Sequence, residues 1–270
     1  MSDKREPCCE SLLDFLAVVK HIESEWCDGE PSYSPFALQL WFRGQRDVSW
    51  PLKPSYFRLP QFIDDPDVGI HAVRSPDEFG LVYKFRLRAP RYLSTLPQND
   101  WEWLFLMQHY GLPTRLLDWT ESALFALYFA LRNHNRDCDA VVWVLDPMWL
   151  NKQIKIYNVP STADSVVVPW CPGSLQAEMP LAIQPIHAST RIAAQRGVFT
   201  IHGRLADGFE KLVRVEEEAR LVPIRICSDH TVAVLDELRK AGIDQTTVFP
   251  GELESLCEEL KRDLIFKSWG

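Results

Sequence analysis

The chain has 270 residues, 46% of them hydrophobic and 24% charged, and its 29 Lys and Arg against 37 Asp and Glu leave a formal net charge of −8. This composition is typical of a globular protein and excludes the disordered and fibrous classes. An acidic chain is also a poor general nucleic-acid binder. The longest apolar run, residues 123–131, is far shorter than the roughly 18 residues that cross a bilayer, so we expect no membrane contact.

The N-terminus and the cysteines favour a cytoplasmic location. Residues 1–10 are charged and contain no apolar segment of the kind that directs secretion. The seven cysteines are an odd number without a Cys-x-x-Cys pair, so we expect free thiols in a reducing compartment. The histidines have neither His-Glu-x-x-His nor His-x-x-x-His spacing, and we therefore expect no metal site.

Apolar periodicity predicts the first elements. Residues 10–26 are expected to form an amphipathic helix, and residues 38–42 a short buried strand that delivers Arg43 at its tip. Several prolines make residues 50–67 an irregular segment. The Ser-Pro-Asp-Glu sequence at 75–78 then predicts the start of a helix that runs to about Arg88.

The middle of the chain predicts two helices joined by a turn. Residues 101–110 have helical periodicity and end at Gly111, with Pro113 just beyond. After this turn we expect a capping residue, Asp118 or Thr120, to start a buried helix over residues 121–131.

The last third predicts further strands and helices. Residues 140–146 and 221–226 are expected to be strands, residues 191–202 a strand pair or a bulged strand around Gly197, and residues 231–241 and 252–266 helices. Strands separated by helices predict an α/β (α+β) fold with a mixed central sheet flanked by helices. We expect a helix in residues 1–30 to pack on a single domain over residues 31–270.

Three stretches resemble the motifs of the FRG domain family, which is named after a Phe-Arg-Gly sequence. The first is Trp41-Phe42-Arg43-Gly44-Gln45, followed by Trp50-Pro51-Leu52. The second is the longest, Met-Gln-His-Tyr-Gly-Leu-Pro-Thr-Arg-Leu-Leu-Asp-Trp-Thr at 107–120 with its continuation at 126–130. The third is Arg191-Ile192 with Gln195, Gly197, Phe199 and Thr200. The chain is therefore identified as a member of this family from about residue 38 to residue 250.

The Arg-Gly sequence also resembles, more weakly, the Tyr-Arg-Gly motif of arginine-type ADP-ribosyltransferases. Those enzymes cleave the nicotinamide–ribose bond of NAD and transfer ADP-ribose. The resemblance implies an ADP-ribosyltransferase-like fold, NAD as a substrate, and a toxin-like effector that modifies RNA, DNA or protein. Some FRG proteins are found in phage-defence settings, so a neutralising antitoxin or a chaperone is an expected partner.

The resemblance implies roles for particular residues. Arg43 would hold the NAD diphosphate through its guanidinium, and Gly44 would let the dinucleotide approach the backbone. A carboxylate from Asp118 or Glu252 would stabilise an oxocarbenium-like transition state. The other residues expected to line the site are Gln45, Gln108, His109, Arg115, Arg191 and Gln195.

Other interpretations of these residues stay open. Arg115 and Asp118 are three residues apart in a tight turn and could pair with each other. From Arg43 to Arg91 there are nine Lys and Arg against six Asp and Glu, a local excess that suits phosphate groups. A metal-dependent nuclease could use Asp118 with Glu121, and a non-catalytic nucleotide sensor could use the arginines alone.

Overall fold

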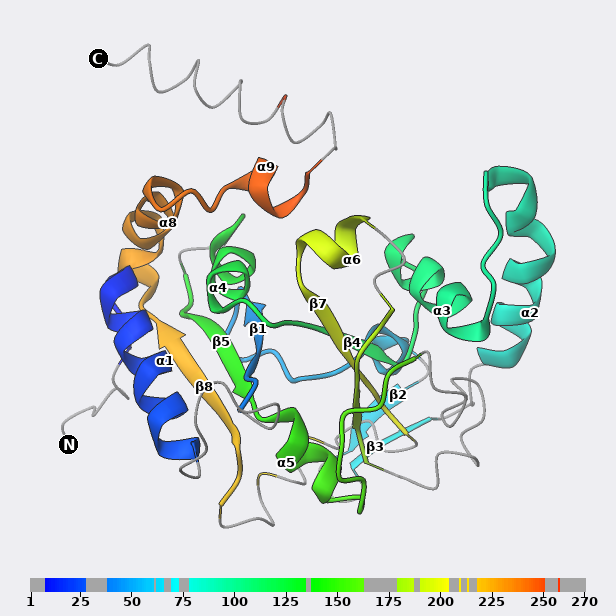
Figure 1. Cartoon of the computed structure of the whole chain (residues 1–270), viewed down its shortest axis with the longest axis horizontal. Coiled ribbons are helices and arrows are strands. Elements are labelled where there is room, and N and C mark those ends of the chain that lie inside the picture. The colour runs from blue at the N-terminus through cyan, green and yellow to red at the C-terminus, as the bar shows by residue number, and fades with distance from the viewer. Residues whose placement is uncertain are drawn as a thin grey trace.

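A computed structural model of the chain describes residues 8–27, 38–60, 62–65, 69–72, 78–134, 137–162, 179–186, 190–203, 209, 213, 218–250 and 257. Their main feature is a six-stranded sheet in the order β6-β7-β4-β1-β5-β8 (Figure 1). Its strands are β1 (Trp41–Gln45), β4 (Leu116–Thr120), β5 (Ala140–Leu145), β6 (Leu181–Ile183), β7 (Gly197–Ile201) and β8 (Leu221–Ile226). Every pair of neighbouring strands is antiparallel. The predicted mixture of helices and strands is confirmed, but the sheet is antiparallel rather than mixed.

Helices cover both faces of this sheet. They are α1 (Leu12–Trp26), α2 (Glu78–Arg88), α3 (Asp100–His109), α4 (Ala123–Leu131), α5 (Pro147–Lys152), α6 (Thr190–Ala194), α8 (Thr231–Lys240) and α9 (Gln245–Val248). On one face, α1, α4 and α8 pack over β1, β5 and β8, while α3 packs over β4, β7 and β6. On the other face, Trp41, Trp119 and Leu145 form a second core with Leu150 of α5. None of the helices in the described part of the chain is long and apolar enough to span a membrane.

The sheet divides between β1 and β4. β1 pairs with β5 along its whole length, and β4 pairs likewise with β7. Between β1 and β4 the register contains a single pair, Phe42 with Thr120. The two strands therefore part beyond this pair, and backbone groups at the division need other hydrogen-bond partners.

Helix α4 lies directly against β1 and depends on Gly44. Side chains alternate along a strand, so Phe42 and Gly44 face α4 while Arg43 and Gln45 face away from it. A Cβ atom at position 44 would lie 1.9 Å from the carbonyl oxygen of Ala126 and 2.6 Å from the amide nitrogen of Ala130. Only glycine allows the two backbones to approach this closely.

Several predicted elements are confirmed. Residues 10–26, 101–110 and 231–241 correspond to α1, α3 and α8, and the strands at 140–146 and 221–226 correspond to β5 and β8. Gly111 and Gly242 follow their helices with φ of 75° and 82°, the left-handed conformation that ends a helix. Helix α2 begins at Glu78, whereas its predicted cap and the predicted helix at 252–266 lie outside the described residues, apart from Cys257.

Three predictions of local structure are wrong. Residues 116–120 form strand β4 instead of a turn, and the cap of α4 is Ser122, whose Oγ accepts a hydrogen bond from the amide of Phe125. Residues 191–202 contain helix α6 followed by β7 rather than a strand pair or a bulged strand. The end of the segment predicted to be irregular forms strand β2 (Phe62–Asp65), which pairs with β3 (Gly69–Ala72) just beyond that segment.

The chain near the N-terminus is tied to β8. Cys9 forms a parallel bridge with Ile226, and α1 then runs beside β8 and α8 (Figure 1). This bridge brings Cys8 to Cys227, and the two form a disulfide with a Cα–Cα distance of 5.5 Å. The prediction of free thiols is therefore wrong for this pair, which is separated by 219 positions in the sequence.

Candidate functional site

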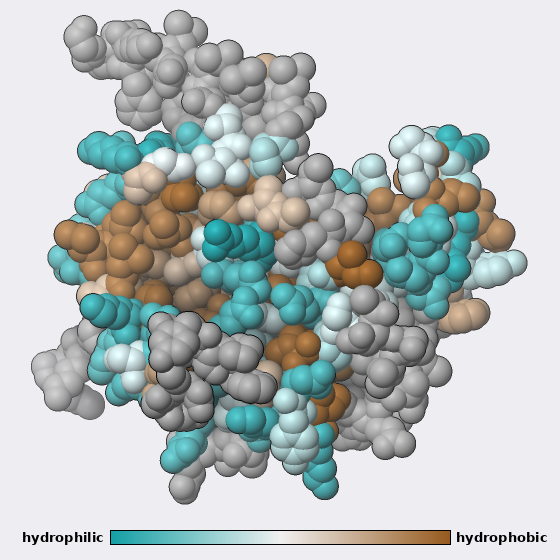
Figure 2. Space-filling view, in the orientation of Figure 1, coloured by the Kyte–Doolittle hydropathy of each residue, from teal (hydrophilic) through white to brown (hydrophobic). Residues whose placement is uncertain are grey.

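A large cavity opens where the sheet divides. Its volume is about 1320 Å³, above the 300–1000 Å³ that is usual for pockets that bind drug-sized ligands. It is lined by residues of β1, β4 and the C-terminal end of α3, together with α4 and the start of β7. Polar residues lie beside apolar ones in the middle of the face shown in Figure 2, between the positions of α4 and α6. The space suits a ligand of dinucleotide size.

Arg43 crosses the division between β1 and β4. Its side chain is 18% exposed, and its Nη1 donates a 2.6 Å hydrogen bond to the backbone carbonyl of Asp118. Nε is buried and has no hydrogen-bond partner among the described residues. Burial lowers the pKa of Arg43, and Arg58 lowers it further, while the nearby charge of Asp118 raises it. Arginine still keeps its charge, so the site contains a desolvated cation with unused donors.

Asp118 supplies the carboxylate nearest to this cation. Its Oδ2 lies 4.0 Å from Arg43 Nη1 and accepts a 3.0 Å hydrogen bond from Gln108 Nε2. Gln108 is held in turn by the Thr114 hydroxyl, which donates to its side-chain oxygen. The Asp118 side chain is 58% exposed and lines the cavity, so a ligand there can reach it. The structure brings together three residues that the sequence predicted: Arg43, Gln108 and Asp118.

Gln45 and Gly44 line the same cavity but also have structural contacts. The Gln45 oxygen accepts a 2.8 Å hydrogen bond from Trp143 Nε1, and its amide donates a 3.3 Å bond to the carbonyl of Pro51. Both ends of the Gln45 amide are therefore already engaged. Gly44 is required for the packing of α4, whereas the sequence assigned it to the approach of a dinucleotide, which stays a prediction.

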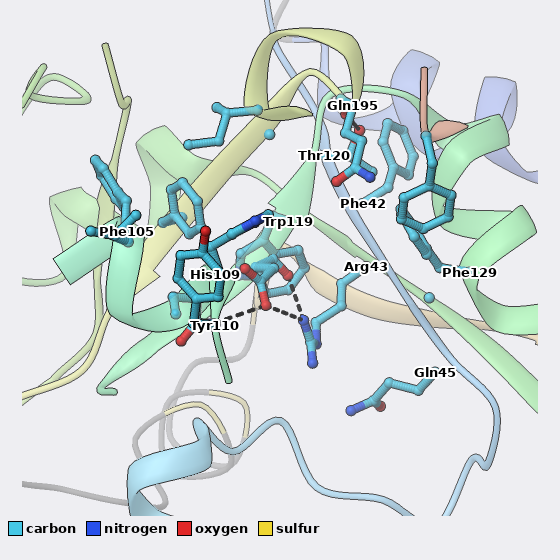
Figure 3. A pocket seen from close by; sticks show the side chains of 18 of the residues that line it. Phe42, Arg43, Gln45, Phe105, His109, Tyr110, Trp119, Thr120, Phe129 and Gln195 are labelled. Carbon is cyan, nitrogen blue, oxygen red and sulfur yellow. Dashed lines mark hydrogen bonds and ion pairs between the residues drawn. The ribbon is translucent and has the colours of Figure 1, made fainter. Parts of the chain in front are cut away.

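Aromatic rings form two sides of the cavity. His109 and Tyr110, at the end of α3, lie on one side near Phe105, and Phe42 and Phe129 lie on the other (Figure 3). The rings of His109 and Tyr110 are 4.9 Å apart in an edge-to-face arrangement. Flat rings on opposite sides with a cation between them suit a ligand with planar bases and anionic groups.

Three further arginines that the sequence analysis did not place in the site also line the cavity: Arg46, Arg58 and Arg132. Among the described residues the lining carboxylates are Glu102 and Asp118, so cations outnumber anions in this part of the lining. Both Glu102 oxygens accept hydrogen bonds near the start of α3, which gives this residue a capping role. Only part of the local basic excess converges here, because Arg86 pairs with Asp100 at 2.6 Å outside the cavity.

Arg115 does not line the cavity. It is buried, and its Nε donates a 2.9 Å bond to Glu78 Oε1 while its Nη1 donates to the carbonyl of His202 at 3.1 Å. The pairing with Asp118 that its sequence spacing suggested is not formed, because Asp118 lies in β4 and faces Gln108. Arg115 therefore links α2 to the end of β7.

The remaining predicted residues divide between the cavity and undescribed parts of the chain. Gln195 lines the cavity, and its Nε2 donates a 3.1 Å hydrogen bond to the carbonyl of Val248. Arg191 lies in α6, and its side chain is outside the described residues. Glu252 is outside them as well. The predicted roles of Arg191 and Glu252 stay predictions.

His202 is a buried residue behind the site that the sequence analysis did not single out. Its ring lies between Phe57 and Phe209, and neither ring nitrogen has a hydrogen-bond partner among the described residues. Burial, together with the charges of Arg43 and Arg115, lowers its pKa from 6.5 to about 3. His202 is therefore neutral near pH 7. In the sequence, only its position directly after an apolar strand indicates that His202 could be buried.

This pKa predicts a pH dependence of stability. Below pH 6.5 the unfolded chain binds a proton at His202 that the folded chain does not bind until about pH 3. Stability should therefore fall with decreasing pH, by about 1.4 kcal/mol per pH unit from this group. Between about pH 7 and about pH 5, the free energy of unfolding of His202→Leu should fall by about 2 kcal/mol less than that of the wild type. Urea denaturation at the two pH values measures the difference. The exposed His21→Gln variant should retain the wild-type dependence, and an unchanged dependence in His202→Leu would refute the assignment.

The fold and the site together define a mixed α/β protein with a cationic, aromatic-lined cavity at the division of its antiparallel sheet. Residues 38–139 match the family model of the FRG domain. This segment is therefore an FRG domain, and the resemblance of the first two motifs is confirmed. The third motif, at residues 191–200, lies beyond the matched segment. No curated protein and no solved structure matches the chain.

Proposed function

We propose that this cavity binds NAD and that the protein transfers ADP-ribose from it to an acceptor. The observation that carries the proposal is the state of Arg43, a mostly buried side chain that lines the cavity and whose Nε has no partner among the described residues. A desolvated charge is costly unless it is well paired, and the nearest carboxylate, that of Asp118, is 4.0 Å away and makes no hydrogen bond to it. Nη1 is used by the Asp118 carbonyl, and no hydrogen bond within the described residues involves Nη2. The Nη2 end of the guanidinium can therefore donate charge-assisted hydrogen bonds to a diphosphate in the cavity.

The surroundings of Arg43 fit the other parts of NAD. The rings of His109, Tyr110 and Phe129 offer stacking surfaces for nicotinamide or adenine. Cleavage of the nicotinamide–ribose bond develops positive charge on the ribose, and a carboxylate beside it lowers that barrier. Asp118 is the carboxylate next to Arg43, so we assign it this stabilising role. Gln108 would fix its orientation through the 3.0 Å hydrogen bond to Oδ2.

The two rival functions have less support. A metal-dependent nuclease needs several convergent ligands. Within the described residues, the one group of three metal-ligating side chains is Glu10, Cys227 and His230, none of which lines the cavity. A nucleotide sensor would use the same arginines and bind NAD without consuming it. Turnover, measured directly, separates the sensor from the transferase.

The test follows NAD labelled separately in its nicotinamide and its adenine, incubated with the protein and with RNA, DNA or cell protein. We expect nicotinamide release together with adenine label on one acceptor class. Asp118→Asn should lower release by about 100-fold or more, because it removes the charge that stabilises the transition state, yet should leave NAD affinity nearly unchanged.

Thr247→Ala, which changes a residue outside the cavity that bonds within its own turn, serves as the matched control and should keep wild-type turnover. Binding of NAD without release in the wild type would support the sensor instead.

The cytoplasmic, toxin-like role in phage defence and the antitoxin or chaperone partner belong to the same proposal, and they rest on family resemblance.

A further inference from the structure

Four side chains that can ligate a metal meet outside the cavity, at the end of β8. Cys227 Sγ lies in a group with Glu10 and His230 whose ligand atoms are all within 4.8 Å of one another. Cys8 Sγ is bonded to Cys227 Sγ and so adjoins the same group. None of these residues lines the cavity that contains Arg43.

Backbone hydrogen bonds between the segment around Cys9 and the end of β8 hold these side chains in place. The amide of Cys9 donates a 2.8 Å hydrogen bond to the carbonyl of Arg225, and the amide of Cys227 donates a 3.1 Å bond to the carbonyl of Cys9. Cys9 itself is 6% exposed and packs into the core. Because side chains alternate in an extended segment, Cys8 and Glu10 lie on the side opposite to Cys9.

A tight turn completes the arrangement. Ser228–His230 form a 3₁₀ helix, in which residues three apart lie one above the other. This turn places His230 on the same side as Cys227, and the amide of His230 bonds to the carbonyl of Cys227 at 3.0 Å. The Ser228 amide is fixed by Asp139 Oδ1 at 3.0 Å. Cys227-x-x-His230 therefore has a short, rigid spacing that is suited to two ligands of one ion.

A simple surface ion pair does not account for His230. Its Nε2 lies 3.9 Å from Glu10 Oε2, longer than a hydrogen bond. Its Nδ1 is buried without a hydrogen-bond partner among the described residues. An imidazole that no described residue hydrogen-bonds at either nitrogen, next to a carboxylate and two sulfurs, is poorly used as a structural residue but well placed as a ligand.

We propose that the reduced protein binds one Zn²⁺ through Cys8, Cys227, His230 and Glu10. Two thiolates, one imidazole and one carboxylate form a donor set that zinc accepts with tetrahedral geometry. Ligand atoms around zinc are about 3.3 to 3.8 Å apart, so the group must contract slightly while the two sulfurs separate. The Glu10 and His230 side chains are 66% and 42% exposed, which leaves them room to adjust.

The disulfide and the zinc site are alternative states of the same sulfurs. A dithiol reductant attacks the Cys8–Cys227 bond through a mixed disulfide, donates two electrons and two protons, and is itself oxidised to a disulfide. The products on the protein are two thiols. Zinc then displaces both thiol protons to the solvent and bonds to the two thiolates. In either state the segment before α1 stays attached to β8, so the attachment survives in a reducing compartment.

The test is a titration of the full chain with Co²⁺, which occupies tetrahedral zinc sites and absorbs visibly. Protein reduced with a phosphine, then freed of it under inert gas, should bind one equivalent. The expected spectrum has thiolate-to-cobalt charge-transfer bands and tetrahedral d–d bands, and Zn²⁺ should abolish both. Protein with the disulfide intact should show neither band, and reduction should restore them.

Variants assign the ligands. Cys227→Ser and His230→Gln should weaken cobalt affinity at least about tenfold, since losing even an indirect partner of a ligand costs about that much. Cys138→Ser removes a cysteine outside the group and should bind like the wild type. Circular dichroism without metal checks that each variant is folded. Reduced wild-type protein that shows no cobalt spectrum, or binding unchanged in both ligand variants, would overturn the proposal.

Discussion

Gly44→Ala is expected to destabilise the protein by more than about 3 kcal/mol or to prevent it from folding. The added Cβ would lie 1.9 Å from the Ala126 carbonyl oxygen, which is backbone and cannot rotate aside. Overpacking of a core usually costs about 1–3 kcal/mol even when side chains can adjust. Here α4 would have to move away from β1 and open the core that contains Phe42 and Leu127. Urea denaturation followed by circular dichroism measures the loss.

Gly197→Ala is the matched control for this prediction. Gly197 also begins a strand beside the cavity, but a Cβ there would meet its nearest atoms at 3.5 Å, an ordinary contact. The free energy of unfolding of the Gly197→Ala variant should stay within about 1 kcal/mol of that of the wild type. A Gly44→Ala protein that unfolds at the wild-type urea concentration would show that α4 does not depend on this glycine.

The helices and strands that were predicted correctly are identified by residues within their own segments. Helices α3 and α8 end at Gly111 and Gly242, whose left-handed φ is a local property that glycine signals in any sequence. Strand β4 was missed because its pattern is not local. Leu116, Leu117, Trp119 and Thr120 are buried on both faces, so the alternation that identifies a strand is absent. Its pairing with β7 comes from residues about 80 positions away.

The same distinction applies to the candidate site. Arg43 was found because an arginine between an apolar strand and a glycine is unusual in its own segment. Arg115 could not be assigned from its segment, because its partner Glu78 lies 37 positions earlier. The sequence spacing of Arg115 and Asp118 suggested a pair, but Asp118 lies in β4 and Arg115 directly before it, so the directions of both side chains depend on the sheet. Cys8 and Cys227 are a similar case, since only the bridge between Cys9 and Ile226 brings them together.

The side chain of Arg43 has two roles that a substitution must separate. Its hydrogen bond to the Asp118 carbonyl joins the two parts of the sheet, and its unused Nη2 is the donor for the proposed diphosphate. Loss of the first contact leaves a backbone acceptor unpaired and should cost about 1–2 kcal/mol of stability. Loss of the second should affect NAD alone.

Arg43→Gln is therefore expected to stay folded but to lose NAD turnover by about 100-fold or more, because charge-assisted bonds to the diphosphate are removed. Arg43→Lys keeps the charge but lacks the planar guanidinium, so its turnover should lie between that of the wild type and that of Arg43→Gln. Nicotinamide release, measured at one NAD concentration below saturation, gives the three rates.

Arg46→Gln separates a specific role of Arg43 from the general positive charge of the cavity. Arg46 lines the same cavity, but its guanidinium lies over Trp50 and donates a 3.4 Å bond to the Asn133 carbonyl. Its loss removes one positive charge without removing the buried donors, so turnover should fall less than about tenfold. Equal losses in the Arg43 and Arg46 variants would mean that the cavity attracts anions only by its net charge. Full turnover in a folded Arg43→Gln protein would exclude Arg43 from the site and remove the observation on which the transferase proposal rests.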